Sequence, residues 1–239
     1  MDLEPFVFQR EGWVIGMRAA DARATDAAAP DDADEIAQAV NCFALRQLRP
    51  EEFAVFTLDL CHNQVDRHFS RFPEEELEKI NRMTPGRPLM ERHDLRGSLP
   101  RGTFFRSCLH RDGDRVSVRP DVYVLRTPEN AAFIQNIEGG VYRETSIGFS
   151  FRLPECSICG EDLRRCSHAP GREYGGRQCH FIMRDVLDVI EGSVVPSGSQ
   201  GTGFVAQTRA LPTRAALEQA RRAFHTPIEL FSRRTWADE

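Results

Sequence analysis

The chain has 239 residues, 41% of them hydrophobic, and a formal net charge of −5 at pH 7. That length and apolar content are enough for one domain with a buried core and additional segments. The negative charge argues against a dedicated nucleic-acid-binding protein. No apolar run approaches the ~20 residues that a membrane-spanning helix needs, so we expect no membrane partner either.

The chain divides into a central domain and two flanking parts. Residues 19–35 are acidic and alanine-rich, which is typical of a linker. Residues 35–48 show helical spacing of apolar side chains and end before Pro50. Near the other end, residues 213–224 read as a helix capped by Thr213. The predicted parts are an N-terminal extension (1–50), a main domain (51–206), and a C-terminal helix and tail (207–239).

Short strands and turn-forming residues dominate the main domain. Proline followed by three glutamates at 73–76 predicts a helix start, because acidic side chains favour the positive end of the helix dipole. A second, short helix is expected from Thr127. Short strands with few helices predict a mainly β protein with flanking helices (α+β) and favour an antiparallel barrel over a parallel sheet. The expected strands are 53–60, 103–109, 115–125, the run around Ser146, and 181–195.

Three segments supply the groups of a serine nucleophile site. Ser146 ends an apolar run, His93 lies upstream, and Glu191 lies downstream. A serine hydroxyl is a poor nucleophile until a base accepts its proton, and a neutral imidazole needs a third group to fix its tautomer. Asp94 is an alternative third member because it is adjacent to His93. Neighbouring strand residues point to opposite faces, so Asp94 reaches that ring only if the chain turns there, and we prefer Glu191.

Each of these residues also has an ordinary structural interpretation. A strand serine such as Ser146 commonly bonds to the backbone, and a glutamate such as Glu191 can protect a sheet edge. It is the joint order His, Ser, Glu that favours catalysis.

The three runs, in this order, resemble the motifs of the prohead (capsid-maturation) serine proteases of tailed bacteriophages over roughly residues 53–206. The matching runs are His93-Asp94, Thr-Ser-Ile-Gly-Phe at 145–149, and Glu-Gly-Ser-Val-Val-Pro at 191–196. The resemblance implies an antiparallel β-barrel like that of herpesvirus assemblins. It implies Ser146 as nucleophile, His93 as general base and Glu191 as the residue that orients His93.

The same resemblance implies a biological setting. The activity would be cleavage of a scaffold or major capsid protein inside an assembling prohead, in the cytoplasm of a bacterial host. It allows self-cleavage and a homo-oligomer. The alternative is a catalytically silent, zinc-stabilised capsid-assembly or scaffold-associated protein with the same fold, which would keep the same motif residues.

Four of the seven cysteines fall within residues 156–179. Cys156 and Cys159 form a Cys-x-x-Cys-Gly knuckle, a spacing that directs two thiolates to one metal ion. Cys166 is the third expected ligand. With no secretory signal, disulfides are disfavoured, and one structural Zn²⁺ is predicted within an inserted zinc knot at 154–180.

The fourth zinc ligand is left open between two residues. Cys179 is the first choice, and His168 is the alternative, since the Cys166/His168 pair would make a smaller loop. Four soft ligands would leave no place for water, so the metal is expected to be structural and to brace a loop beside Ser146. The layout resembles a zinc-knuckle-bearing branch of the prohead protease-like proteins.

Overall fold

The computed structural model describes residues 33–205. Predictions for residues 1–32 and 206–239, which include most of the acidic linker and the C-terminal helix at 213–224, lie outside the described residues. Within residues 33–205 no helix is long and apolar enough to cross a membrane.

Helices form a minor part of this region. They are α1 (Ala33–Asn41), η1 (Pro50–Glu52), α2 (Glu74–Met83), α3 (Pro128–Glu138) and η2 (Leu163–Arg165), where η denotes a 3₁₀ turn. The helices predicted after Pro73 and Thr127 are confirmed as α2 and α3. The helix predicted at 35–48 ends earlier, because the Asn41 side chain accepts a hydrogen bond from Leu48 N at 2.7 Å and donates one to Leu48 O at 3.0 Å. These two bonds fold the chain back after α1.

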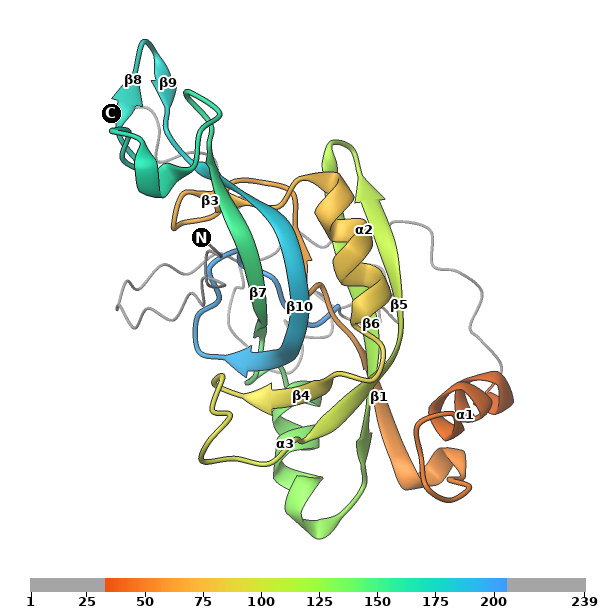
Figure 1. Cartoon of the computed structure of the whole chain (residues 1–239). Coiled ribbons are helices and arrows are strands. Elements are labelled where there is room, and N and C mark those ends of the chain that lie inside the picture. The colour runs from red at the N-terminus through yellow and green to blue at the C-terminus, as the bar shows by residue number, and fades with distance from the viewer. Residues whose placement is uncertain (1–32, 206–239) are drawn as a thin grey trace, which may run out of the picture. The chain divides into compact units, whose positions relative to one another are not determined.

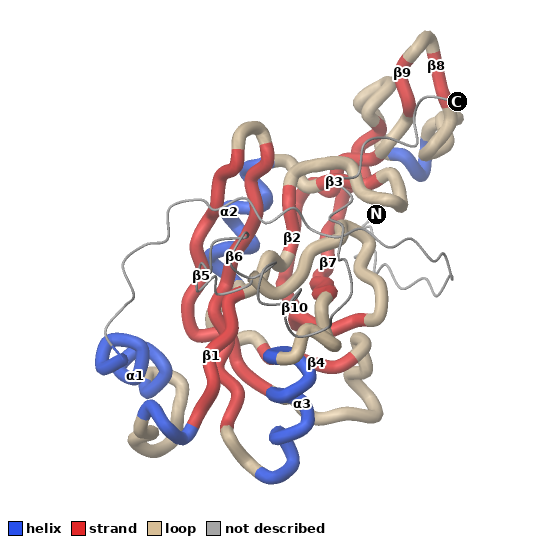
Figure 2. Tube along the Cα trace, turned by 180° about the vertical axis from the view of Figure 1, so that it is seen from behind, coloured by secondary structure: helices blue, strands red, loops and turns tan. Residues whose placement is uncertain are grey.

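The larger sheet contains eight strands. They are β1 (Phe53–Thr57), β2 (Cys61–His62), β3 (Ser70–Arg71), β4 (Pro88–Glu91), β5 (Gly102–Asp112), β6 (Arg115–Leu125), β7 (Glu144–Cys156) and β10 (Phe181–Val195). Their order is β1-β6-β5-β4-β10-β3, with β2 paired to β6 and β7 paired to β10. A separate hairpin joins β8 (Glu173–Tyr174) to β9 (Arg177–Gln178). Figures 1 and 2 show these strands from opposite sides.

The sheet is mixed and open. β10 runs parallel to β3 and β4 but antiparallel to β7. Parallel pairing is possible here because long connections separate β3 and β4 from β10. The mainly β, α+β class predicted from the sequence is confirmed, whereas the expected closure into an antiparallel barrel is wrong for residues 33–205. The long strand β10 has partners on both of its sides, and it therefore holds together segments that lie far apart in the sequence.

Two helices cover different parts of this sheet. Leu77 and Ile80 of α2 are fully buried in a cluster with Val118 of β6 and Val189 of β10, and burying each side chain stabilises the fold by roughly 1.5–3 kcal/mol. α3 buries Phe133, Ile134 and Ile137 in a second cluster with Leu89 of β4 and Val194 of β10. Figures 1 and 2 both place α3 beside β4. This second cluster supports the end of β10 where Glu191 lies.

The loop after β10 is tied to β2 through His62. Gln200 Oε1 accepts the His62 backbone N–H at 2.9 Å, and Gln200 O lies 2.9 Å from His62 Nε2. His62 Nδ1 in turn accepts the Gln64 backbone N–H at 3.2 Å. The ring is therefore held as the neutral tautomer with its proton on Nε2. The loop continues to Thr202, whose carbonyl accepts the N–H of Thr145, next to Ser146.

Stability should fall as the pH is lowered below about 6.5, the pKa of an unperturbed histidine. Burial lowers the pKa of His62 in the folded protein. The unfolded chain then binds more protons than the folded one in this range, so the free energy of unfolding rises with pH. Urea unfolding at pH 5 to 8 should show a shallower pH slope for His62→Gln than for wild type. An identical slope in the two proteins would contradict the assignment, and His68→Gln, at an exposed site, is the matched control.

Candidate functional site

Three strands converge where the sequence places its candidate catalytic residues. β4 ends at Glu91, which pairs with Val194 of β10. On the other side of β10, Glu191 pairs with Gly148 of β7, and Ser193 pairs with Ser146. The segments that contain His93, Ser146 and Glu191 are therefore neighbours in one sheet, although they are widely separated in the sequence.

A bulge in β10 fixes which side chains share a face. The register shifts between Val189 and Glu191, so Ile190 is an extra residue in β10. Residues directly opposite each other, and residues two apart on one strand, project to the same face of a sheet. Ser146, Glu191 and Ser193 therefore project to the same face.

His93 reaches this face through an unusual turn of the backbone. Arg92 and His93 both have φ of 57°, in the left-handed region that non-glycine residues rarely occupy. Arg92 N–H donates to Val194 O at 2.9 Å, and His93 N–H donates to Ser193 Oγ at 3.0 Å. The turn brings the imidazole over β10, where His93 Nδ1 lies 2.5 Å from Glu191 Oε1.

The Glu191 carboxylate is buried, with an exposed fraction of 1%. A buried carboxylate is stable only when its oxygens are hydrogen-bonded or paired. Oε1 contacts His93 Nδ1, and Oε2 accepts the Ser193 hydroxyl at 2.5 Å. With the Nδ1 proton directed at a carboxylate, Nε2 is the ring nitrogen left to accept another proton. This is the arrangement that a general base requires.

Asp94, the alternative partner of His93, has a different role in the structure. Its Oδ1 accepts the backbone N–H groups of Gly97 at 2.7 Å and of Arg96 at 3.2 Å. The side chain thus closes its own turn, and Glu191 is the carboxylate that contacts the His93 ring.

Ser146 is half-buried on β7, directly opposite Ser193. The preceding residue, Thr145, is fully buried and donates its hydroxyl to Asp59 O at 2.7 Å, which fixes this part of the strand. Among residues 33–205 no hydrogen bond joins the Ser146 hydroxyl to His93. In free enzymes such bonds are often long and tighten when substrate binds. The structure therefore brings the three residues to one site and directly joins two of them.

Gly148 makes room for the buried carboxylate. A Cβ atom at this position would overlap Glu191 Oε1. In the sequence, Gly148 and Ser193 are only members of the two motifs, and no function is predicted for either. The alternation of side chains along a strand is the signal that indicates them. Gly148 is two residues from Ser146, and Ser193 is two residues from Glu191, so each shares a face with a predicted site residue.

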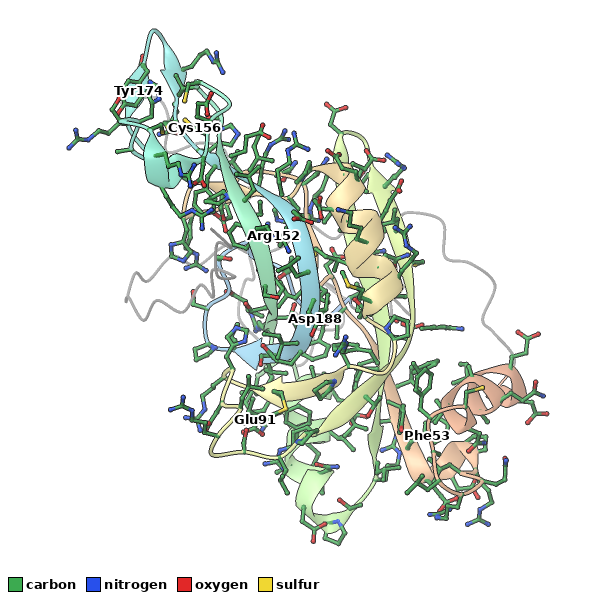
Figure 3. The ribbon with its side chains drawn as sticks, viewed as in Figure 1. Phe53, Glu91, Arg152, Cys156, Tyr174 and Asp188 are labelled. Carbon is green, nitrogen blue, oxygen red and sulfur yellow. The ribbon has the colours of Figure 1, made fainter. Side chains whose placement is uncertain are left out.

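The cysteine-rich insertion, residues 156–180, forms what we call the cysteine lobe. It follows β7 and precedes β10, and it contains η2 and the β8–β9 hairpin. Figure 1 shows the hairpin beyond the ends of β7 and β10, and Figure 3 labels Cys156 and Tyr174 in the same region. The stretch predicted as an insertion, 154–180, thus includes η2 and the β8–β9 hairpin.

Four donor atoms converge inside the lobe. The Sγ atoms of Cys156, Cys159 and Cys166 and a ring nitrogen of His168 all lie within 4.8 Å of one another. Four ligands at Zn–S distances of ~2.3 Å around a tetrahedral ion would lie roughly 3.8 Å apart. The set is therefore compatible with one metal ion, and three thiolates with an imidazole suit Zn²⁺.

The geometry favours His168 as the fourth ligand. His168 Nδ1 is buried, and no hydrogen-bond partner lies near it in the described part of the chain; a metal ion would satisfy this atom. Cys179 Sγ lies 4.0 Å from Cys156 Sγ but outside the group of four. Burial, followed by the neighbouring Cys156 thiol, raises the pKa of Cys179 to about 11, and burial also raises the pKa of Cys166, so the choice rests on the positions of the donor atoms. Cys179, the first choice from sequence, is therefore the weaker candidate.

Cys156 has the opposite electrostatic environment. Burial opposes ionisation, but the backbone N–H groups of Cys159 and Ile158 and the neighbouring thiols lower the pKa of Cys156. Ile158 N lies 3.5 Å from Cys156 Sγ. Backbone donors directed at a sulfur stabilise a thiolate, which is the form that binds metal.

The sequence predicts that the metal-binding loop lies beside Ser146, and the structure shows that the lobe lies elsewhere. Cys156 and Ser146 are ten residues apart on the same strand, which at ~3.3 Å per residue corresponds to roughly 30 Å. Figure 3 shows Cys156 near one end of β7 and Glu91, next to the His93 turn, near the other. The candidate metal site and the candidate active site are therefore separate.

Comparison with known proteins found no relative of this chain. No protein-family model, no curated protein and no solved structure matches the chain.

Proposed function

We propose that this protein is a serine endopeptidase that cleaves scaffold or capsid proteins during phage capsid (prohead) maturation. The observation that carries the proposal is the contact of 2.5 Å between His93 Nδ1 and Glu191 Oε1. A buried carboxylate that contacts one nitrogen of a partly exposed histidine, with Ser146 on the same face of the neighbouring strand β7, is the arrangement of a Ser-His-acid triad. A mainly β fold is also compatible with an assemblin-like relative.

Each residue has a defined task in this mechanism. His93 Nε2 accepts the proton of Ser146, whose Oγ attacks the scissile carbonyl carbon. The tetrahedral intermediate collapses when His93 gives that proton to the leaving amine, which leaves an acyl-enzyme on Ser146. Water, deprotonated by His93, then releases the acyl group and restores the serine. Glu191 remains ionised, holds the tautomer and stabilises the imidazolium.

The biological assignment rests on the motif resemblance. It favours a major capsid or scaffold protein as substrate and an assembling prohead in the bacterial cytoplasm as the location. It also allows self-cleavage and a homo-oligomer. One structural Zn²⁺ on Cys156, Cys159, Cys166 and His168 would give the lobe its fold, and no catalytic step passes through it.

A fluorophosphonate probe tests the nucleophile without knowledge of the substrate. Ser146 Oγ should attack the phosphorus, the P–F bond should break, and fluoride should leave as His93 takes the proton. Intact mass should show one adduct on wild type and on Ser150→Ala, a serine on the same strand, and none on Ser146→Ala. The expected difference in labelling rate is at least ~10³-fold.

Co-expression with a major capsid or scaffold protein tests the substrate. Discrete truncations should appear with wild type and disappear with Ser146→Ala. If folded, zinc-loaded wild type takes up no probe and leaves every partner at full length, the protein is the silent assembly factor instead.

A further inference from the structure

Ser193 is a fourth polar residue at the site, and the triad gives it no task. It lies on β10 and is fully buried, with 0% of its surface exposed. Its Oγ accepts the backbone N–H of His93 at 3.0 Å and donates to Glu191 Oε2 at 2.5 Å. One hydroxyl therefore contacts both the histidine backbone and the buried carboxylate.

The direction of these two bonds follows from their chemistry. An N–H group can only donate, so the His93 amide must use a lone pair of Ser193 Oγ. The single hydroxyl proton of Ser193 then remains for Glu191, and an ionised carboxylate can only accept. Hydrogen bonds to a charged acceptor are short and strong. The hydroxyl therefore fixes the rotation of the carboxylate, and with it the position of Oε1 against His93.

The hydrogen bond from His93 N–H to Ser193 Oγ stabilises an unfavourable backbone conformation. Arg92 and His93 are consecutive non-glycine residues at positive φ, a conformation that persists only where its surroundings enforce it. β10 supplies both anchors, because Val194 O accepts the Arg92 N–H and Ser193 Oγ accepts the His93 N–H. Without the hydroxyl, one of the two anchors is lost and the imidazole is no longer fixed over Glu191.

We infer that Ser193 is a positioning residue that sets the geometry of the His93–Glu191 pair from both sides. It is not a rival nucleophile, because it is fully buried and its proton is directed at Glu191, whereas Ser146 is partly accessible. The inference deepens the proposed function. Only its kinetic test, the labelling rate of Ser146, rests on that function.

The first test is the NMR signal of the His93 Nδ1 proton, which needs no turnover. In ¹⁵N-labelled wild type, an Nδ1–H directed at a carboxylate at 2.5 Å should give a resolved downfield resonance. Ser193→Ala should lose it or move it strongly upfield. Ser193→Thr, which keeps the hydroxyl, should restore it, and Ser150→Ala should leave it unchanged.

The second test is the fluorophosphonate labelling rate. Ser193→Ala should lower the maximal rate of Ser146 labelling about 10–100-fold and leave the half-saturating probe concentration unchanged, since the imidazole is displaced but the access path is not. Ser193→Cys replaces the hydroxyl by a somewhat larger thiol, which fills the site but is only a weak donor. It should reproduce the loss, and it replaces Ser193→Ala if that variant fails to fold.

The outcomes separate the two ideas. If wild type takes up no probe but Ser193→Ala still abolishes the His93 resonance, the endopeptidase proposal fails and the positioning role stands. If the resonance and the labelling rate are both unchanged in Ser193→Ala and Ser193→Cys, the positioning role is overturned.

Discussion

Removal of zinc by a chelator should unfold the cysteine lobe and leave the eight-stranded sheet folded. The lobe contains only two-residue strands and one 3₁₀ turn, so its own hydrogen bonds and core are too few to order it. Binding free energies of structural zinc sites are about 10–16 kcal/mol, and in such small elements this energy is folding energy. Hydrogen exchange should therefore rise by at least ~10³-fold in peptides from 157–178 and stay constant in peptides from β5 and β6.

Single substitutions should show which residues hold the ion. By elemental analysis, wild type should contain one zinc per chain. Cys159→Ser and His168→Ala should lose most of it, whereas Cys179→Ser should keep it. Cys108→Ser, an exposed cysteine outside the lobe, is the control. Retention of zinc by His168→Ala together with its loss from Cys179→Ser would reverse the assignment of the fourth ligand.

The metal-free protein also tests the separation of the two sites. Ser146 is held by its pairing with Ser193 and by buried Thr145, and neither contact involves the lobe. Labelling of Ser146 should therefore persist at close to the wild-type rate after zinc removal. Loss of labelling with the sheet intact would show that the lobe supports the active site.

Local elements of the fold were predictable because local chemistry determines them. The strand expected at 181–195 matches β10 in both bounds, since its β-branched and other apolar residues recur along the whole segment and no proline interrupts it before Pro196. α2 follows from Pro73 and the glutamates after it. The early end of α1 depends instead on the Asn41 side chain reaching Leu48, seven residues away, and no helical periodicity reports such a contact.

The open sheet was not predictable for a related reason. Whether β10 pairs with β4 in parallel or with another strand in antiparallel fashion is decided by contacts between residues about a hundred positions apart. Strand composition alone does not distinguish these pairings. The number and length of the strands therefore did not determine whether the sheet closes into a barrel.

In the candidate site, too, the residue types were predictable from the sequence and the backbone geometry was not. The residue types of His93 and Glu191 and their order in the chain were enough to propose a pair, and the structure places them in contact. The left-handed backbone at His93 and the bulge at Ile190 determine how they meet. Neither has a distinctive residue such as glycine to mark it. Ser193 therefore went unassigned, although its contacts depend on both features.

Glu191→Gln should lower the rate of Ser146 labelling by about 10³–10⁴-fold, the effect of neutralising the acid in a serine triad. The amide has nearly the same shape as the carboxylate, so the sheet should remain intact. It has, however, no negative charge to stabilise the imidazolium. Its NH₂ group can also face His93 Nδ1, which would move the ring proton to Nε2 and remove the acceptor that Ser146 needs.

The matched control is Glu91→Gln on β4. Glu91 lies two residues from His93 and pairs with Arg101 at 2.9 Å, but it does not contact the imidazole. Loss of its charge should change the rate less than ~5-fold, because partly exposed ion pairs contribute little. Equal losses in the two variants would point to a general electrostatic effect. A loss confined to Glu191→Gln would show that the contact between Glu191 and His93 is what activates Ser146.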